Sequence, residues 1–379
     1  LIEREEVLAI IGPVFSGPSV AAAVVAEAAG VPMIAPLAQQ SGLDTLGSNI
    51  FQLNVIPEVQ GQALAEYATL VFGFETLAVI APLSDYGLAF EQEFDEVATA
   101  NGGNVASVNW YYPGETKDFR GIFEDIRKVG FSLRPPAPPD SFVAPDAVSV
   151  GELDTLLFGE LNPDEPLFQE EEAEEELVEP DSSEMFIEEI DAIIMVIEDF
   201  RDAETIIPQL YFHRLETQVL GNDIWNNPDA IRRLRRIDRD HFKGILLVAR
   251  RPHSDPVSQR FVDSFRVQFG RDPGFAANGF DAARLVISGW EQGSRTRSEL
   301  RDWLGSVRSF EGASGRISFP PGRRSNDELV LLKIDQRSKI RLVGAEDLPD
   351  LSVAHEDLPQ ADLPQEEMLK DEVDGDEAG

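Results

Sequence analysis

The sequence predicts an α/β protein built on parallel sheets. Apolar runs at residues 7–11 and 77–82, and a third at 190–197 in which Asp191 is the only charged residue, have the length and character of strands that are buried on both faces. Other stretches, such as 60–72 and 258–269, carry apolar residues at helical spacing. Strands that alternate with helices in this way are typical of βαβ units, in which parallel strands are covered by helices.

The first βαβ unit stands at the start of the chain. Residues 7–11 form its expected first strand, and Ser16-Gly17-Pro18-Ser19 then offers helix-start chemistry, because a serine hydroxyl can cap free amides and proline fits the first helical position. We expect a helix over 20–29 that ends at Gly30, and a second strand over 32–34. A loop at a helix N-terminus favours an anion, so this loop is a candidate binding loop.

The later elements follow the same alternation. We expect strands at 51–55, 77–82, 105–111, 190–197, 217–220, 244–248, 312–319 and 328–334, and helices at 60–72, 88–101, 119–129, 203–214, 258–269, 279–293 and 299–306. Gly130 is expected to end the third of these helices, and Pro208 to break the fourth. The loops at 83–87 and 221–227 follow strand ends, where open α/β sheets bind ligands.

Two segments do not have the composition of the fold. Residues 133–185 begin with a proline-rich stretch and continue with many glutamates, so we interpret them as a flexible insertion. Residues 344–379 repeat Asp-Leu-Pro in an acidic tract and are interpreted as a disordered tail. For residues 133–185, the alternative is an acidic docking arm for a basic partner or cations. For residues 344–379, the alternative is a periodic linear motif for a partner.

Composition excludes several classes of function. The 379 residues allow two to three domains, and the net charge of −37 argues against nucleic acid as a partner, which needs a basic face. No run of eighteen apolar residues is present, so we expect no membrane span. Cysteine is absent, which removes disulfides and zinc-thiolate sites. Because the chain starts at Leu1 in mid-pattern, we expect it to be a fragment.

No motif indicates an enzyme. Ser16 does not lie in a Gly-x-Ser-x-Gly elbow, and the four histidines show no metal-binding spacing. A Gly-x-x-x-x-Gly-Lys-Ser/Thr loop is missing, as is a Gly-x-Gly-x-x-Gly after a strand. We therefore expect a protein without catalytic activity, cofactor or metal.

Taken together, three motifs resemble those of the type I periplasmic binding proteins. These are Ile11-Gly12-Pro13-x-x-Ser16-x-x-Ser19, Gly30-Val31-Pro32-Met33-Ile34-Ala35-Pro36-x-Ala38, and Asp85-Tyr86-Gly87 after a strand. The resemblance covers roughly residues 1–334 and is closest to the branched-chain amino-acid receptors that feed ABC transporters. It implies a bacterial periplasmic or otherwise extracytoplasmic protein that captures a small, amino-acid-like ligand for a membrane ABC permease.

The resemblance also implies a domain organisation. Two doubly wound, Rossmann-like lobes would be joined by a hinge around a central cleft, with the βαβ unit that precedes Glu3 in the family missing. Residues 1–56 and 247–325 would form the first lobe, and residues 57–246 and 326–343 the second, which would carry the insertion 133–185. Closure of the lobes would bury the ligand.

A second resemblance leaves the function open. The Asn222-Asp223-x-Trp225-Asn226 pattern and the long tract before Gly221 look most like proteins labelled penicillin-binding protein activators. Such a protein would use the same fold to regulate peptidoglycan synthesis, with a cell-wall synthase as its partner. Gln39 and the acidic insertion favour this alternative, whereas Tyr86 and Asp223 favour the receptor.

Seven residues are candidates for ligand binding by resemblance. The first lobe would contribute Ser16, Ser19, Ala38 and Gln39, and the second lobe Tyr86, Phe200 and Asp223. Hydroxyls at a helix N-terminus suit a ligand carboxylate, and Asp223 can accept charge-assisted bonds from an ammonium. Two departures affect ligand identity: Gln39 stands where receptors offer Ser or Thr, and Asp223 is shorter than the usual glutamate.

Each of these residues also has a structural interpretation. Ser16 or Ser19 could cap its helix, and Asp223 could cap the segment that begins at Ile224. Tyr86 could pack on a lobe surface, and Trp225 is expected to pack in the core or at the rim. The basic stretch 232–239 is expected to form a solvated surface.

Overall fold

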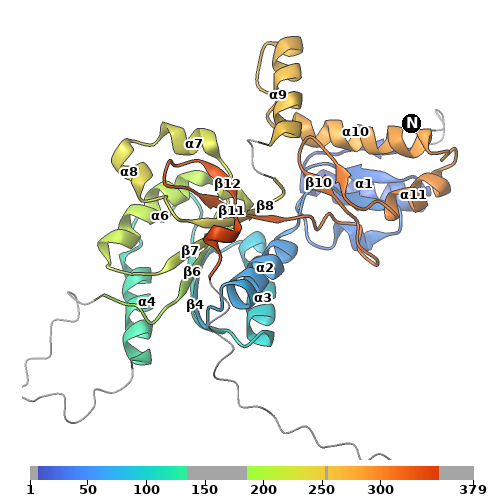
Figure 1. The fold of residues 1–379 in the computed structure, drawn as a ribbon. Coiled ribbons are helices and arrows are strands. Elements are labelled where there is room, and N and C mark those ends of the chain that lie inside the picture. The colour runs from blue at the N-terminus through green and yellow to red at the C-terminus, as the bar shows by residue number, and fades with distance from the viewer. Residues whose placement is uncertain (1–6, 135–185, 252–254, 350–379) are drawn as a thin grey trace, which may run out of the picture.

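The computed structural model describes residues 7–134, 186–251 and 255–349. These residues form a larger lobe around a seven-stranded sheet and a smaller lobe around a three-stranded sheet (Figure 1). The expected insertion lies outside the described residues except for its first two positions, as does the expected tail beyond residue 349. None of the described helices is both long enough and apolar enough to cross a membrane.

The larger lobe contains a mixed sheet in the order β12-β11-β8-β7-β6-β4-β5. Its strands are β4 (Thr76–Pro82), β5 (Asn104–Tyr111), β6 (Ala192–Met195), β7 (Gln218–Gly221), β8 (Leu246–Ala249), β11 (Val330–Ile334) and β12 (Ile340–Leu342). Strands β4 to β8 are parallel, and β11 runs antiparallel to both of its neighbours. The carboxyl ends of the parallel strands therefore meet at one edge of the sheet.

Helices cover both faces of this sheet. They are α2 (Pro57–Glu66, continued by a π-helical turn, Tyr67–Val71), α3 (Asp85–Ala100), α4 (Arg120–Leu133), α6 (Phe200–Phe212), α7 (Pro228–Arg233) and α8 (Arg236–Asp240). Side chains alternate along β6, so Ile193 and Met195 pack with α4 and α6, whereas Ala192 and Ile194 pack with α2 and α3. This two-sided burial explains the unbroken apolar run that the sequence shows at 192–197.

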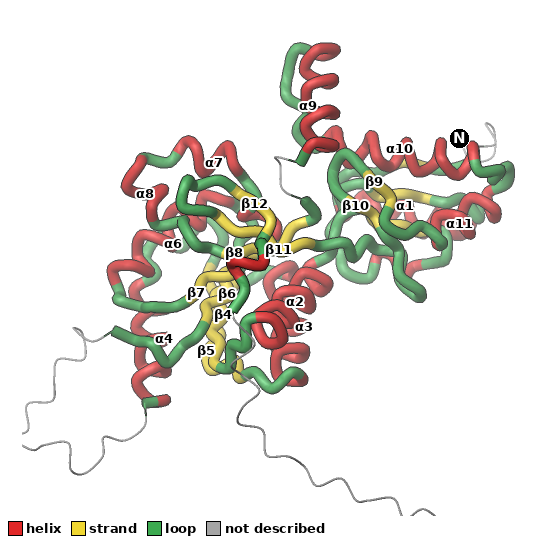
Figure 2. Tube along the Cα trace, in the orientation of Figure 1, coloured by secondary structure: helices red, strands yellow, loops and turns green. Residues whose placement is uncertain are grey.

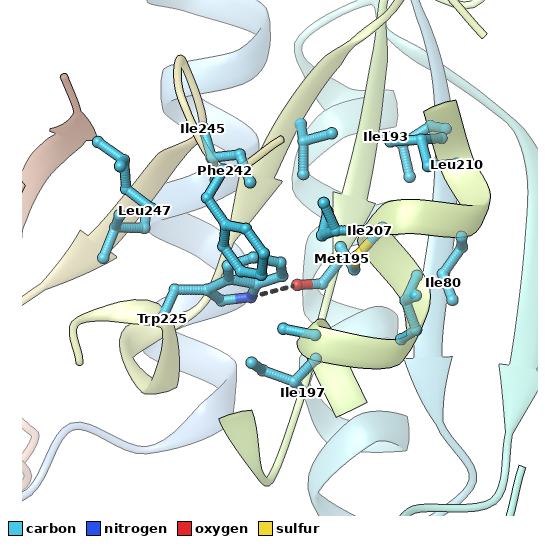
Figure 3. Packing of buried hydrophobic residues seen from close by; sticks show 14 of the residues in the cluster. Ile80, Ile193, Met195, Ile197, Ile207, Leu210, Trp225, Phe242, Ile245 and Leu247 are labelled. Atoms are coloured by element: carbon cyan, nitrogen blue, oxygen red, sulfur yellow. Dashed lines mark hydrogen bonds between the residues drawn. The ribbon is translucent and has the colours of Figure 1, made fainter. Parts of the chain in front are cut away.

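The core on the α6 side is centred on aromatic rings. Trp225 is fully buried, and its Nε1 donates to the Met195 carbonyl oxygen at 3.0 Å (Figure 3). The Phe242 ring lies 6.0 Å from that of Trp225 and 5.7 Å from that of Phe200. A Cβ at position 221 would come within 2.4 Å of the Trp225 ring, so glycine there allows the indole to pack against β7.

The smaller lobe is formed by two segments of the chain, one from β1 to β3 and the other from α9 to β10. It contains β1 (Ile10–Ile11), α1 (Ser16–Ala28), β2 (Met33–Ala35), η1 (Leu43–Leu46), β3 (Ile50–Gln52), α9 (Pro256–Phe269), α10 (Ala276–Glu291), α11 (Arg297–Gly305), β9 (Phe310–Glu311) and β10 (Arg316–Ile317). The parallel sheet has the order β1-β2-β3. Helix α10 buries Ala282 and Leu285 in its core, whereas α9 buries no residue and extends away from the lobe (Figures 1 and 2).

Three chain segments connect the lobes, after β3, after β8 and before β11. Two of them run together: the Gln52 amide donates to the Arg324 carbonyl oxygen at 2.8 Å, and the Asn326 side chain donates to the Leu53 carbonyl oxygen at 3.3 Å. The expected lobe boundary at 247 falls inside β8, which stays in the larger sheet through Ala249. The chain therefore leaves the larger lobe after Ala249.

Several predicted boundaries are wrong. The expected strand at 7–11 is only β1, and Ile11 is 45% exposed because β1 pairs with β2 alone among the described strands. Helix α1 begins at Ser16 with Phe15 as its N-cap, and no side chain caps it. Helix α3 begins at Asp85, because the Ser84 hydroxyl accepts from the Gly87 amide at 3.1 Å.

Gly130 and Pro208 do not act as expected. Gly130 lies inside α4, where a Cβ would come within 2.4 Å of Ile187, so it allows close packing and does not end the helix. Helix α6 continues through Pro208, with Ile206, Ile207 and Leu210 buried on both sides of it. The burial of this apolar face compensates for the one backbone hydrogen bond that proline removes.

The tail was also predicted to start too early. Residues 345–347 form the short helix η4, and Asp347 binds Lys333 at 3.2 Å and the Arg341 guanidinium at 2.5 Å. These contacts fix residues 344–349 against β11 and β12, so the folded part of the chain extends through the first of the Asp-Leu-Pro repeats.

Candidate functional site

Polar side chains gather where β4, β6 and β7 of the larger lobe end. Tyr86 lies in the first turn of α3, directly after β4, and Asn222 and Asp223 follow β7. Glu198 follows β6, and its carboxylate accepts a hydrogen bond from the Ser84 hydroxyl. Because parallel strands place their carboxyl ends at one edge, these residues meet although they are far apart in sequence.

Gly87 explains how Tyr86 reaches this edge. A Cβ at position 87 would lie 2.0 Å from the carbonyl oxygen of Pro82, the last residue of β4. Only glycine therefore lets the first turn of α3 fold back closely on the end of the strand. The Asp85-Tyr86-Gly87 motif thus has a direct structural function in positioning the phenol.

Asn222 is fully buried and holds the cluster together. Its side-chain amide donates to the Tyr86 hydroxyl at 3.0 Å and to the Ile197 carbonyl oxygen at 2.7 Å, while its Oδ1 accepts from the Ile197 amide at 3.1 Å. The side-chain amide nitrogen and the side-chain oxygen of Asn222 thus both have partners. Asn222 therefore orients the Tyr86 oxygen and leaves the phenolic proton available as a donor.

Asp223 is held by its backbone, while its carboxylate stays partly free. Its amide donates to Oε1 of the fully buried Gln60 at 3.1 Å, and Gln60 in turn donates to the Val55 carbonyl oxygen at 3.3 Å. The Oδ1 atom of Asp223 is buried and has no hydrogen-bond partner among the described residues. An ionised carboxylate oxygen in this state attracts a hydrogen-bond donor or a cation.

Burial raises the pKa of both groups. It raises the pKa of Asp223 to about 6, although the nearby Arg250 charge acts in the opposite direction. Burial, together with the charge of Asp223, raises the pKa of Tyr86 well above its usual value. At pH 7 the cluster therefore presents an ionised carboxylate beside a neutral phenol.

Arg250 connects this cluster to the smaller lobe. Its guanidinium donates to the Leu53 carbonyl oxygen at 3.4 Å, to Ser314 Oγ at 3.0 Å and to Asn278 Oδ1 at 3.3 Å. Burial lowers the pKa of Arg250, and the charges of Asp223 and Asp281 counteract this effect. Arg250 thus lies at the junction of the lobes, where its charge interacts with those of Asp223 and Asp281.

Asp281 and Asn278 fix the smaller-lobe side of this junction. The fully buried Asp281 accepts hydrogen bonds from the amides of Ala313 and Ser314, both at 2.7 Å, and from the Ser314 hydroxyl at 2.5 Å. Asn278 donates to the Pro36 carbonyl oxygen at 2.8 Å. The loop that follows β2 is thereby linked, through α10, to Arg250.

The candidate residues of the smaller lobe divide into two pairs. Ser16 Oγ accepts a hydrogen bond from the backbone amide of Gln39 at 3.4 Å, which leaves the hydroxyl proton of Ser16 available. Ser19 is fully buried and donates to the Phe15 carbonyl oxygen at 2.8 Å, and the side chain of Ala38 is packed in the core. Ser16 and Gln39 could therefore contact a solute, whereas the side chains of Ser19 and Ala38 are enclosed.

Phe200 is a correction to the sequence prediction. It is 5% exposed and stacks on Phe242 in the core of the larger lobe, so its ring does not face a cleft. The capping alternative for Asp223 is also wrong, because the short helix Asp223–Trp225 has Asn222 as its N-cap and no side-chain cap. Trp225 packs in the core, which confirms the structural interpretation of that residue.

The structure therefore groups four of the seven candidates into two pairs. Tyr86 and Asp223 lie together in the larger lobe, and Ser16 and Gln39 lie together in the smaller lobe. The hydrogen bonds of the described residues do not join one pair to the other. Sequence analysis missed Gln60, Asn278 and Arg250; only Arg250 had a local signal, since it directly follows a strand at a predicted crossing.

No metal centre accompanies these residues. In the part of the chain that the structure describes, no three His, Cys, Asp or Glu side chains are grouped so that they could hold an ion. A groove of about 520 Å³ lies elsewhere, between α9 and α10.

Comparison with known proteins finds a family model that matches the first third of the chain. Residues 1–131 match the family model described as periplasmic binding protein. No curated protein matches the sequence.

Solved structures match over most of the chain. A candidate branched-chain amino acid ABC transporter from Rhodospirillum rubrum is 20% identical with a TM-score of 0.67, over 90% of this chain and 81% of that one. A branched-chain amino acid substrate-binding protein from Streptococcus pneumoniae, solved with isoleucine, is 18% identical with a TM-score of 0.56, over 92% and 82%. A solute-binding protein of an ABC transporter from Rhodopseudomonas palustris, solved with 3,4-dihydroxybenzoic acid, is 16% identical with a TM-score of 0.57, over 90% and 79%.

Proposed function

This chain has the fold of the type I periplasmic binding protein superfamily, and from that premise we propose that it is a non-catalytic, extracytoplasmic solute-binding protein. Its ligand is an amino acid or a related small molecule, which it delivers to an ABC-type importer. The likeness to structures of substrate-binding proteins supports a solute-binding role. The ligand class comes from the chemistry of the Tyr86 and Asp223 cluster.

The observation that carries this proposal is the unpartnered Oδ1 of Asp223. A buried carboxylate oxygen without a donor costs about 1–3 kcal/mol, and an ammonium group would remove that cost with a charge-assisted hydrogen bond. The neutral Tyr86 phenol, oriented by Asn222, offers a donor beside it. One anionic acceptor next to one neutral donor suits the polar end of an amino acid.

The smaller lobe would bind the other end of the ligand. Ser16 retains a proton that it can donate to a carboxylate, and the Gln39 side chain can donate from its amide. Closure about the three connecting segments would bring these donors toward Asp223. Arg250 lies at the junction of the lobes and provides a positive charge there.

A ligand screen by thermal unfolding tests the proposal. The full chain is heated at pH 7 with each common amino acid and with small carboxylic acids. A ligand that binds only the folded state at about 100 times its Kd adds about 2.7 kcal/mol to the free energy of unfolding, which raises Tm by several degrees. Asp223→Asn should abolish the shift, whereas Asp302→Asn, at an exposed ion pair, should leave it unchanged.

The pH dependence gives an independent readout. Protonation of Asp223 removes the charge that attracts an ammonium, so affinity should fall as the pH drops through about 6. A hit whose affinity is constant from pH 5 to pH 8, or one that survives Asp223→Asn, would assign binding to another site. Absence of any shift, together with retention of a peptidoglycan synthase in a pull-down, would favour the activator-like alternative.

A further inference from the structure

Helices α9 and α10 enclose an apolar groove that the proposed solute site does not use. The groove has a volume of about 520 Å³ and is lined chiefly by Phe261, Phe265, Phe269 and Phe280. The ring centroids of Phe265 and Phe269 are 4.5 Å apart, and those of Phe261 and Phe280 are 4.9 Å apart. The aromatic side chains therefore form one continuous surface along two helices.

This surface is unusually exposed. Phe269 and Phe280 are 55% and 44% exposed, and α9 buries no residue at all. A contiguous aromatic surface on a projecting helix typically marks a binding site for another chain segment. Because the groove is open along α9, its shape suits an extended peptide with apolar side chains at intervals.

The rim of the groove is positively charged. Arg260 has no ion pair within the described residues, and neither does Arg284. Arg284 instead donates to the Glu311 carbonyl oxygen at 2.7 Å and lies over the rings of Phe280 and Phe310. The charges of both guanidiniums therefore remain available, and the groove favours an occupant that is both apolar and acidic.

The end of this same chain has that composition. Residues 350–379 contain eleven acidic residues and one lysine, and they carry Leu358, Leu363, Met368 and Leu369 at intervals between the acids. Residue 349 is the last one described, so these apolar side chains follow 9 to 20 residues later. At about 3.3 Å per residue, this tether spans roughly 30–65 Å, which is comparable with the diameter of a folded chain of this size.

We propose that the acidic segment 350–379 binds in the groove between α9 and α10, with its leucines against the phenylalanine rings and its carboxylates beside Arg260 and Arg284. This segment carries both the negative charge that complements the arginines and the apolar side chains that suit the phenylalanine rings. A second copy of the chain is the other possible occupant, and it would bury the rings without using the free arginine charges.

Disulfide trapping in the full chain tests this placement, because the protein contains no cysteine of its own. Ser264→Cys places a thiol in the wall of the groove, and Gln365→Cys places one beside the second leucine-proline pair. The rate of intramolecular disulfide formation is measured at low protein concentration. Two matched backgrounds keep the same tether: Arg260→Glu with Arg284→Glu, and Leu358→Ser with Leu363→Ser.

A docked segment should cross-link about tenfold faster than in either background, because docking raises the effective concentration of the two thiols above that of a free tether. High salt should slow the reaction of the parent pair. Equal rates in all three proteins would overturn the proposal, and so would cross-links that form between chains and increase with concentration. Unchanged Tm values establish that the variants are folded, since all substituted positions lie outside the cores.

Discussion

The two lobes differ in how they bury their sheets. In the larger lobe, helices cover both faces of seven strands, and the side chains of Phe90, Phe123 and Trp225 are fully buried. In the smaller lobe, β1 is an edge strand among the described strands, Phe15 before α1 is 76% exposed, and Val24 on α1 is 58% exposed. Apolar burial supplies the main driving force for folding, so the larger lobe should carry most of the stability.

The lobe that should contribute most of the stability is therefore not the lobe with the most exposed apolar surface. The larger lobe has a rigid sheet edge on which Tyr86, Asn222 and Asp223 are held by buried partners. The smaller lobe is held more by polar contacts around Arg250 and Asp281 and retains exposed apolar surface on α1 and α9. Regions with few buried contacts open at lower free energy, so the smaller lobe is where segments can bind or move.

The largest expected effect is at the centre of the larger lobe. Trp225→Ala removes a fully buried ring and leaves the Met195 carbonyl oxygen without its donor, so the free energy of unfolding should fall by about 3–5 kcal/mol. Phe265→Ala on α9 is the control and should cost less than about 1 kcal/mol. Urea denaturation measures both, and similar losses would contradict the contrast between the lobes.

The next effect concerns the polar contacts of the smaller lobe. Asp281→Ala leaves the amides of Ala313 and Ser314 without an acceptor and removes a counter-charge of Arg250. The free energy of unfolding should fall by about 2–4 kcal/mol. An exposed aspartate, Asp302, provides the control and should give less than about 0.5 kcal/mol when replaced by alanine. A loss below 1 kcal/mol for Asp281→Ala would mean that apolar packing alone holds this lobe.

A smaller effect of opposite sign is expected at the binding edge. Burial raises the pKa of Asp223 to about 6 from 3.8, so the folded protein binds this proton more tightly and loses stability as the pH rises through that range. Asp223→Asn should therefore increase the free energy of unfolding at pH 7 by roughly 1–3 kcal/mol. The gain should vanish below about pH 4. Denaturation curves at pH 4 and pH 7 measure it, and a loss of stability at pH 7 would refute the assignment.

The smallest expected effect is on α9. Val267 is 89% exposed, so Val267→Ser should change the free energy of unfolding by less than about 0.5 kcal/mol. Hydrogen exchange should nevertheless distinguish the lobes, because the amides of α9 should exchange faster than those of β4 and β6. Equal protection of α9 and the central strands would show that the two lobes form one cooperative unit.

The fold could be predicted because its signals are local. The apolar runs at 77–82 and 190–197 contain β4 and β6, and the α/β class and the type I periplasmic binding protein fold are confirmed. Helix boundaries were less accurate. The Ser84 cap of α3 was readable as a serine three residues before Gly87, but Phe15 at the start of α1 offers no side-chain signal at all.

The candidate site could be predicted only in part. Tyr86 and Phe200 both follow strand ends, yet Tyr86 joins the polar cluster and Phe200 enters the core. The difference depends on neighbours that lie far away in sequence, because Asn222 binds one and Phe242 stacks on the other. No pattern around either aromatic residue carries that information.

The amino-acid sequence by itself determined the strands, the helices and their alternation, because runs of apolar residues and their spacing act within a few neighbouring positions. Tertiary structure alone decided which polar groups share the edge of the larger sheet, that the charge of Arg250 interacts with those of Asp223 and Asp281, and that α9 and α10 enclose a groove. The cluster at the sheet edge joins residues that are more than a hundred positions apart, as Tyr86 and Asn222 are, and all three outcomes are selected by packing rather than by local propensity.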